Sequence, residues 1–298
     1  MRIPGLRGLP LRAVAMETFR EFQRDDMWSY GSALAFRAVF ALFPFLLFLV
    51  ALFSFLELPG LFDWLLDRGE ALLPAEAQGQ VREVVEEVRG QRRGGLLSFG
   101  VLGAVWVASG GVRSVMNALN AAYDVPEGRP WWKRFPLSVA YTLAVGALVV
   151  AATLLVVLGP RATAWILDGL GAGSGLLELV RWLRLPAAFL LATAAVTLVY
   201  LAGPNVRQRL RMVMPGAVLA VVLWVAATSG FRLYVANFGR FGVTYGSIGA
   251  VIILLAYLYL SSLILLLGAE LNAVVQHRAP RPGDAVPKEE PEEDDGGG

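Results

Sequence analysis

Cysteine is absent from this chain of 298 residues, and histidine occurs only once. Without cysteine there can be no disulfide, thiolate metal site or cysteine nucleophile. The single histidine, His277, argues against a zinc hydrolase or a Ser-His-Asp triad, because these sites need several metal ligands or a well-placed base. We therefore predict no catalytic residue, no bound metal and no cofactor, although an enzyme stays open as an alternative.

Charged residues are also scarce. They form 17% of the chain, against about 25% in soluble domains, and hydrophobic residues form 56%. The mean hydropathy is +0.59. A net charge of +2 is too small to suggest binding to nucleic acid. No Walker A motif is present, which argues against ATP-driven transport by this chain alone. We expect membrane lipids around the protein and no nucleic-acid partner.

The apolar residues gather into long segments instead of alternating with polar ones. A helix needs about 20 mostly apolar residues to cross a hydrocarbon layer of about 30 Å. Several segments reach this length, so we predict an all-α fold, a polytopic transmembrane helical bundle with about six spans plus interfacial helices. The predicted spans are 31–56, 96–118, 136–158, 185–203, 213–235 and 246–269.

Three regions follow from this pattern. Residues 1–30 are predicted to be a cytoplasmic segment with a juxtamembrane helix, and residues 31–275 the transmembrane domain. Its extracytoplasmic loop 57–95 contains four valines at helical spacing, which predict an interfacial helix: Val81, Val84, Val85 and Val88. Residues 276–298 have few apolar side chains and are predicted to be a disordered cytoplasmic tail.

The orientation follows from basic residues near the ends of the spans, which stay preferentially in the cytoplasm. With six spans, four groups fall on one side of the membrane. The loop 57–95 places further arginines on the other side, but it is longer and also rich in acidic residues. We therefore predict a bacterial cytoplasmic (inner) membrane protein with both termini in the cytoplasm. The four groups are Arg2 to Arg24, Arg129 to Arg134, Arg207 to Arg211, and His277 to Arg281.

Polar residues inside apolar spans are the candidate functional residues, because each costs a few kcal/mol in lipid unless it meets a partner or water. Arg37, Arg113 and Glu270 lie towards the cytoplasmic half. We predict that they line a polar cavity, with Glu270 as the counter-ion of the arginines. Snorkelling of all three towards the inner interface is the alternative. The predicted cavity residues are Arg37, Arg113, Asn117, Asn120, Glu270 and Asn272.

Two further features have a functional and an ordinary interpretation. Pro44 removes a backbone hydrogen bond from the first span and predicts a helix kink, for which packing is favoured over a substrate site. Arg207, Arg209 and Arg211 are candidate contacts for anionic lipid headgroups, although anchoring at the cytoplasmic surface explains them as well. Asn117 and Asn120 also fit a simple helix end docked onto the next loop.

Four successive motifs resemble the YihY and virulence factor BrkB family of bacterial inner-membrane proteins, over roughly residues 17 to 275. They are SALAFRAVFALFPFLLFLVALF, SGGVRSVMNALNAAYDV with the downstream RPWWKRF, GPNVRQRLRMVMPGAVLAVVLW, and YGSIGAVIILLAYLYLSSLILLLGAELNAV. The resemblance implies about six membrane helices. Some members have carried the label ribonuclease BN, and others are associated with serum resistance or envelope-lipid export. Arg37 stands where the family pattern implies an uncharged residue.

The favoured function is therefore transport or flipping of a lipid or other amphiphile through a polar cavity between helices. A membrane scaffold or accessory subunit of envelope biogenesis is the alternative, and a ribonuclease is a third, less favoured one. We leave open a homo-oligomer or an envelope protein as partner.

Overall fold

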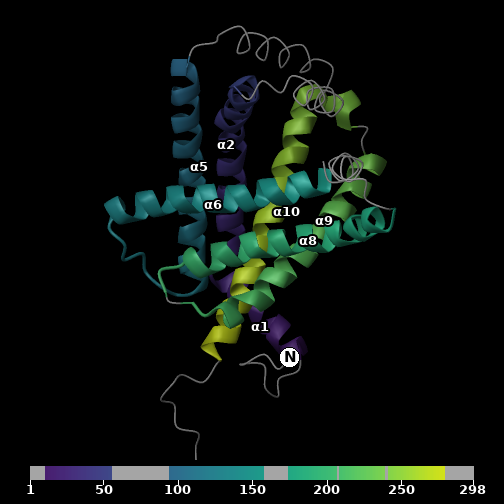
Figure 1. Ribbon diagram of the computed structural model, residues 1–298. Coiled ribbons are helices and arrows are strands. Elements are labelled where there is room, and N and C mark those ends of the chain that lie inside the picture. The colour runs from purple at the N-terminus through teal and green to yellow at the C-terminus, as the bar shows by residue number, and fades with distance from the viewer. Residues whose placement is uncertain (1–10, 56–93, 158–173, 207, 239–240, 279–298) are drawn as a thin grey trace, which may run out of the picture.

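The computed structural model describes residues 11–55, 94–157, 174–206, 208–238 and 241–278. These residues are almost all helical, and no strand occurs among them (Figure 1). The helices are α1 (Leu11–Arg24), α2 (Met27–Phe55), α5 (Gly94–Ala122), α6 (Trp131–Val157), α8 (Ser174–Ala202), α9 (Leu210–Phe238) and α10 (Phe241–His277). The predicted all-α class is confirmed.

Six of these helices, all except α1, cover most of the six predicted spans. Four contain a stretch that is long and apolar enough to cross a membrane: Trp131–Thr153, Trp182–Ala202, Leu210–Val235 and Val251–His277. Crossing by α2 and α5, and hence the count of six, stays a prediction. The loop 57–95, with its predicted interfacial helix, and the tail 276–298 lie almost wholly outside the described residues.

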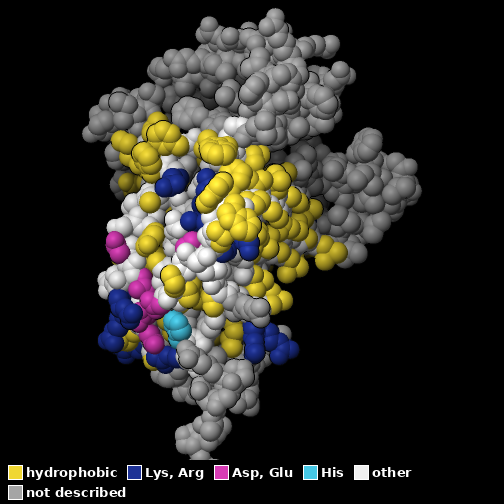
Figure 2. Space-filling view, turned by 90° about the vertical axis from the view of Figure 1, so that its left-hand side faces the viewer, with side chains coloured by type: hydrophobic (Ala, Val, Ile, Leu, Met, Phe, Trp, Pro, Cys, Tyr) yellow, Lys and Arg dark blue, Asp and Glu magenta, His cyan; other side chains and the backbone are white. Residues whose placement is uncertain are grey.

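The outer surface of the described helices is apolar. Trp131 is 79% exposed, Trp182 74% and Trp106 62%, and many leucines and valines of α6, α8 and α9 also point outward. Figure 2 shows a broad area of hydrophobic side chains on one face. Such an exterior is favourable in hydrocarbon, and patches of this extent are rare on soluble monomers. The chain is therefore a helical membrane protein.

The helices run in two main directions. α6 and α8 pack side by side and cross in front of α2, α5 and α10 (Figure 1). α2 packs along α5, and α9 along α10. Polar bonds also join α9 to α10, where Trp224 donates to Ser261 at 3.2 Å and the hydroxyls of Thr228 and Tyr257 lie 3.0 Å apart.

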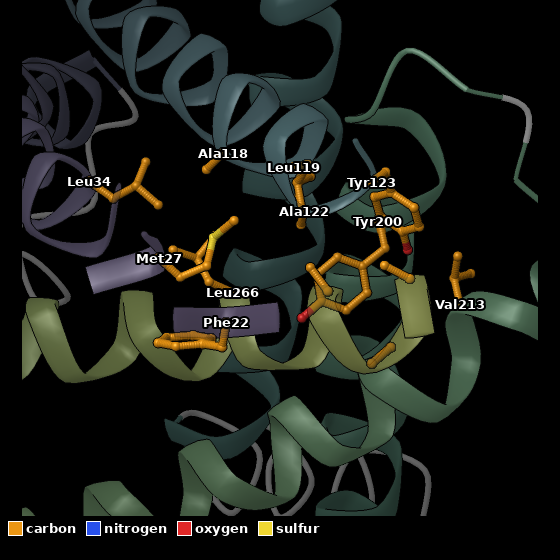
Figure 3. Packing of buried hydrophobic residues seen from close by; sticks show 13 residues of the cluster. Phe22, Met27, Leu34, Ala118, Leu119, Ala122, Tyr123, Tyr200, Val213 and Leu266 are labelled. Carbon is orange, nitrogen blue, oxygen red and sulfur yellow. The ribbon is translucent and has the colours of Figure 1, made fainter. Parts of the chain in front are cut away.

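The buried core lies at one end of the bundle, where α1 meets the final turns of α5, α8 and α10 and the first turns of α9. Figure 3 shows Phe22, Met27 and Leu266 grouped near α10, with Tyr123 and Tyr200 beside them. α1 buries Val14, Thr18 and Phe22, at a spacing of four residues that places them on one helix face. The predicted juxtamembrane segment is thus an integral part of the core.

The backbones of α9 and α10 meet at two glycines. A Cβ atom on Gly216 would lie 2.0 Å from the Gly268 carbonyl oxygen, and one on Gly268 would lie 2.4 Å from the Tyr200 hydroxyl. Only glycine fits at such a contact. Tyr200, from α8, donates its hydroxyl to the Leu265 carbonyl at 2.5 Å, so three helices are fixed at this crossing.

Asn272 joins the same two helices by hydrogen bonds. Its Oδ1 accepts from the Gly216 backbone N–H at 2.8 Å, and its Nδ2 donates to the Val213 carbonyl at 2.9 Å. Both bonds are buried, and they lie beside Pro215, which contributes no backbone N–H to α9. The structure therefore places Asn272 in a contact between helices that stabilises the fold.

Replacing Asn272 with Ala should leave the Gly216 N–H and the Val213 carbonyl buried without a partner. We expect a loss of about 1–3 kcal/mol for each group, which a lower unfolding midpoint in detergent would report. Ser229→Ala is the control, because the Ser229 hydroxyl is exposed and bonds only to the Val225 carbonyl of its own helix. Equal midpoints for both variants would contradict the assignment.

Candidate functional site

Glu270 is the most deeply buried acidic residue among those the structure describes, with 1% of its surface exposed. α10 carries it into the core between Ala269 and Ala273, which are also buried. Within the described part of the chain, no donor group bonds either of its carboxyl oxygens. A buried carboxylate without a bonded partner is costly, so this position needs a physical explanation.

The carboxyl groups of Asp25 and Glu270, which we call the acid pair, lie within hydrogen-bonding range of each other. Asp25 belongs to the tight turn between α1 and α2, in which Asp26 adopts a φ of 52°. This left-handed conformation is one that aspartate tolerates better than most residues. The turn directs the side chain of Asp25 inward, where only 11% of it is exposed.

Further acidic groups surround the acid pair. Glu270 is within electrostatic range of Glu21 on α1 and of Asp124 just beyond α5. Among the described residues, the basic side chain in range is Arg24. It pairs with Glu21 at 3.1 Å and lies 3.9 Å from Asp124 and 4.0 Å from Asp25. Its side chain is 64% exposed, so water screens much of its charge.

Several other buried polar atoms at this end of the bundle also lack hydrogen bonds among the described residues. They include the hydroxyls of Thr18 and Tyr123, both amide atoms of Gln208, and Oε1 of Gln276. Burial, and then the charge of Glu270, raise the pKa of the Tyr123 phenol well above its usual range. The phenol therefore stays neutral and is available as a hydrogen-bond donor.

A second group of polar residues, the loop network, holds the segment after α5 against the end of α8. Asn120 donates Nδ2 to Glu127 at 3.0 Å and accepts the Asn205 backbone N–H at 2.7 Å. Arg129 bonds Glu127 at 2.7 and 2.9 Å and the Gly203 carbonyl at 2.8 Å. The sequence-based interpretation of Asn120 as part of a docked helix end agrees with these bonds.

Glu127 is the central acceptor of the loop network. Its burial acts to raise the pKa, but hydrogen bonds and the positive charge of Arg129, together with the bond from Asn120, lower the pKa below the usual value. Arg134 adds an ion pair at 3.4 Å. The ionised carboxylate thus stabilises the native loop.

A third group, the arginine group, consists of Arg37 on α2, Arg113 on α5 and Arg134 on α6. Arg113 donates from Nη1 to the hydroxyls of Ser109 and Ser138, at 2.9 and 3.1 Å, and its guanidinium lies 5.4 Å from the centre of the Phe135 ring. Arg134 donates to the Arg113 carbonyl and to Oδ1 of Asn117, at 3.0 and 2.5 Å. Arg113 is within electrostatic range of the other two arginines.

The arginine group has little negative charge to balance it. Of these three arginines, only Arg134 forms an ion pair within the described part of the chain, with Glu127. Arg37 is exposed and has no hydrogen-bond partner there. Large apolar side chains stand beside the group, including Trp106, packed 5.0 Å from Phe135, and Phe36, 4.7 Å from Phe40. Figure 2 shows basic side chains bordered by hydrophobic ones midway up this face.

The structure thus divides the predicted cavity residues among separate places. Arg37, Arg113 and Asn117 come together around α5, whereas Glu270 lies in the core and Asn272 between α9 and α10. No ion pair joins Glu270 to Arg37 or Arg113 among the described residues. Arg209 and Arg211 are exposed at the start of α9. Arg207 and the side chain of Pro44 lie outside the described part, so their predicted roles stay predictions.

The sequence analysis did not single out Asp25, Glu127 or Ser138, and it used Arg134 only as one of the basic residues near span ends that set the orientation. The position of Arg134 just after the tryptophans at the start of a span could have drawn attention to it. Its contact with Arg113 could not be predicted, because it depends on how α6 crosses α5. Asp25 had only the Asp25–Asp26 turn to mark it. Among the described residues, no group of three His, Asp or Glu side chains is arranged to hold a metal ion.

Comparison with known proteins places this architecture in a family. The model of the family described as "Virulence factor BrkB" matches residues 18–293. The chain belongs to the BrkB family. The predicted resemblance is confirmed, and it covers nearly all the described helices. No solved structure matches the chain.

Relatives of this BrkB family member carry general names. The chain is 35% identical to YfkH of Bacillus subtilis, named as a ribonuclease-like protein, over 90% of this chain and 97% of that one. It is 31% identical to a UPF0761 membrane protein of Alkalilimnicola ehrlichii, over 87% of this chain and 58% of that longer protein. A UPF0761 membrane protein of Pseudoalteromonas atlantica is 26% identical over 85% of this chain and 83% of that protein. The predicted membrane location is confirmed at this general level.

Replacing Glu127 with Gln should weaken the loop network, because Arg129 and Arg134 would lose their ionised partner. We expect a loss of about 1–3 kcal/mol at neutral pH, measured by denaturant or thermal unfolding in detergent. Since the folded pKa of Glu127 is lowered, its contribution is present above the unfolded value near 4.5 and is lost as the pH falls through the folded pKa.

The variant should therefore show a flatter decline in stability at acidic pH than the wild type. Asp26→Asn is the matched control, because Asp26 is exposed and Asn also tolerates its positive φ. If Glu127→Gln and Asp26→Asn gave the same acid profile, Glu127 would not anchor the loop.

Proposed function

We propose that this protein binds a lipid or other amphiphile with an anionic headgroup and moves it across the membrane. The observation that carries the proposal is the arginine group, in which Arg37 and Arg113 lack an acidic partner among the described residues while apolar side chains surround them. An anionic headgroup would supply the missing negative charge, and its hydrocarbon tails would lie against the neighbouring aromatic residues.

The chemistry of the arginine group suits a phosphate. Guanidinium groups bind phosphate oxygens through paired, charge-assisted hydrogen bonds, and three guanidiniums from α2, α5 and α6 can surround one headgroup. Lys133, whose Nζ lies 4.9 Å from the centre of the Trp132 ring, extends the basic surface beside exposed tryptophans. Such a mixture of tryptophan and basic residues is typical of the headgroup level of a membrane.

The proposed setting is the bacterial cytoplasmic membrane, with both termini in the cytoplasm. Its support is the distribution of basic residues and the position of α1 and the last turn of α10 at the same end of the bundle (Figure 1). Glu17 on α1 and Arg278 after α10 form an ion pair there, with an Nε–Oε1 bond of 3.0 Å. Termini on the same side require an even number of spans.

A transfer assay in vesicles tests the proposed function. Purified protein would be reconstituted with two tail-labelled lipids, one with an anionic phosphate headgroup and one zwitterionic. We expect faster transfer of the anionic lipid between leaflets. Arg113→Gln and Arg37→Gln should each slow it by about tenfold or more, since one charged hydrogen bond contributes about 1.5–3 kcal/mol.

Arg232→Gln is the matched control, because Arg232 is an exposed arginine of α9 outside the arginine group. Folded protein that moves neither lipid would overturn the transport proposal, and arginine variants as active as the control would overturn the role of the arginine group. Transfer-RNA cleavage by the purified protein would favour the ribonuclease suggested by the name of YfkH. Crosslinking to one dominant envelope protein without transfer would favour a scaffold.

A further inference from the structure

The contact between the carboxyl groups of Asp25 and Glu270 requires a proton. Two ionised carboxylates can only accept hydrogen bonds, so neither can donate to the other. No other donor reaches the Glu270 oxygens among the described residues. Two carboxyl groups in contact share one proton, because ionising both would place two negative charges side by side at a large electrostatic cost.

The surroundings of the acid pair strengthen this requirement. On α1, Glu21 and Arg24 face it, and beyond α5, Asp124 and Tyr123 do. Gln208, just before α9, is an uncharged polar neighbour of Tyr123, and Arg209 and Arg211 at the start of α9 are exposed. His277 and Arg278, at the end of α10 itself, are exposed. The field at the acid pair is therefore mainly negative, and binding of a proton reduces it.

We propose that Asp25 and Glu270 form a proton-binding site, in which one shared proton holds the turn between α1 and α2 against α10. Loss of this proton leaves two carboxylates in contact next to Glu21 and Asp124, and their repulsion moves α1 away from α10. The site is a pH-dependent latch between the N-terminal helix and the core. It does not depend on whether the protein transports an amphiphile.

The contacts of α1 fit such a latch. Its described bonds to α10 are few: the ion pair of Glu17 with Arg278, and the acid pair at the turn that follows it. Only one face of α1 is buried, while Met16 and Phe19 on the opposite face are about half exposed. A change of charge at one end can therefore shift this helix without disrupting the contact between α9 and α10.

The electrostatics of Asp25 support the direction of the effect. Burial, and then the negative charge of Asp124, raise the pKa of its carboxyl group. A folded pKa above the unfolded one means that the contribution to stability is present at low pH and is lost as the pH rises through the folded value. Docking of α1 should therefore weaken as the pH rises, whereas the contribution of Glu127 is lost as the pH falls.

Two measurements on the full chain in detergent or lipid vesicles test the site. The first is infrared spectroscopy in heavy water, which detects the carbonyl stretch of a protonated carboxyl group. We expect the wild type to lose the band of one buried carboxyl group as the pH is raised. Glu270→Gln and Asp25→Asn should each lack this band, because the introduced amide donates to the remaining carboxylate. Asp26→Asn should retain it.

The second measurement follows the position of α1. Because the chain has no cysteine, cysteines introduced at Met16 and Trp131 would be the only sites for spin labels. The distance between the labels should change with pH in the wild type and Asp26→Asn. It should stay constant in Asp25→Asn and Glu270→Gln.

A wild type with no titrating buried carboxyl band would overturn the proton site, and so would a Glu270→Gln variant that titrates like the wild type. If the carboxyl band titrates but the distance between the two spin labels stays constant, the pH-dependent movement of α1 is overturned. Should Glu270→Gln fail to fold, Asp25→Asn, at a turn, gives the same two readouts. None of these readouts involves lipid transfer, so a negative transfer assay leaves them unchanged.

Discussion

The contact between the backbones of α9 and α10 at Gly216 and Gly268 is the constraint on which the rest of the structure depends. A membrane protein cannot use the hydrophobic effect to join helices within lipid, so close packing and hydrogen bonds between helices replace it. The two glycines allow the approach, Asn272 bonds across it, and Tyr200 adds α8. With α9 and α10 fixed, the last turns of α10 form the surface on which α1 and the end of α5 pack.

This constraint explains why the buried core and the acidic groups lie at the same end of the bundle. Glu270 and Asn272 are two positions apart on α10 and point to different neighbours. Asn272 satisfies backbone groups of α9, whereas Glu270 faces the turn between α1 and α2. One stretch of helix therefore carries two side chains with different chemistry. The amide of Asn272 does not titrate, whereas the carboxyl group of Glu270 can bind or release a proton.

Much of the fold could be predicted from the sequence, because lipid imposes a simple requirement on length and hydropathy. The all-α class and the positions of six helices followed from apolar segments, although their ends did not: α10 runs on to His277 because α1 and α9 cover its polar turns. The sequence also marked the polar residues inside the apolar segments as unusual. Their grouping could not be predicted, since it depends on α6 crossing α5 and on α1 folding back to place Asp25 beside Glu270.

The crosswise helix α6 has a consequence for how the protein tolerates change. Only 6% of its apolar stretch is buried by the rest of the molecule. Most of its side chains therefore have surrounding lipid as their main neighbour, and lipid adapts to a change in side-chain shape more readily than a packed core does. We therefore expect α6 to accept exchanges of one apolar residue for another along its outer surface, whereas a change at Ser138 would remove the hydroxyl to which Arg113 donates.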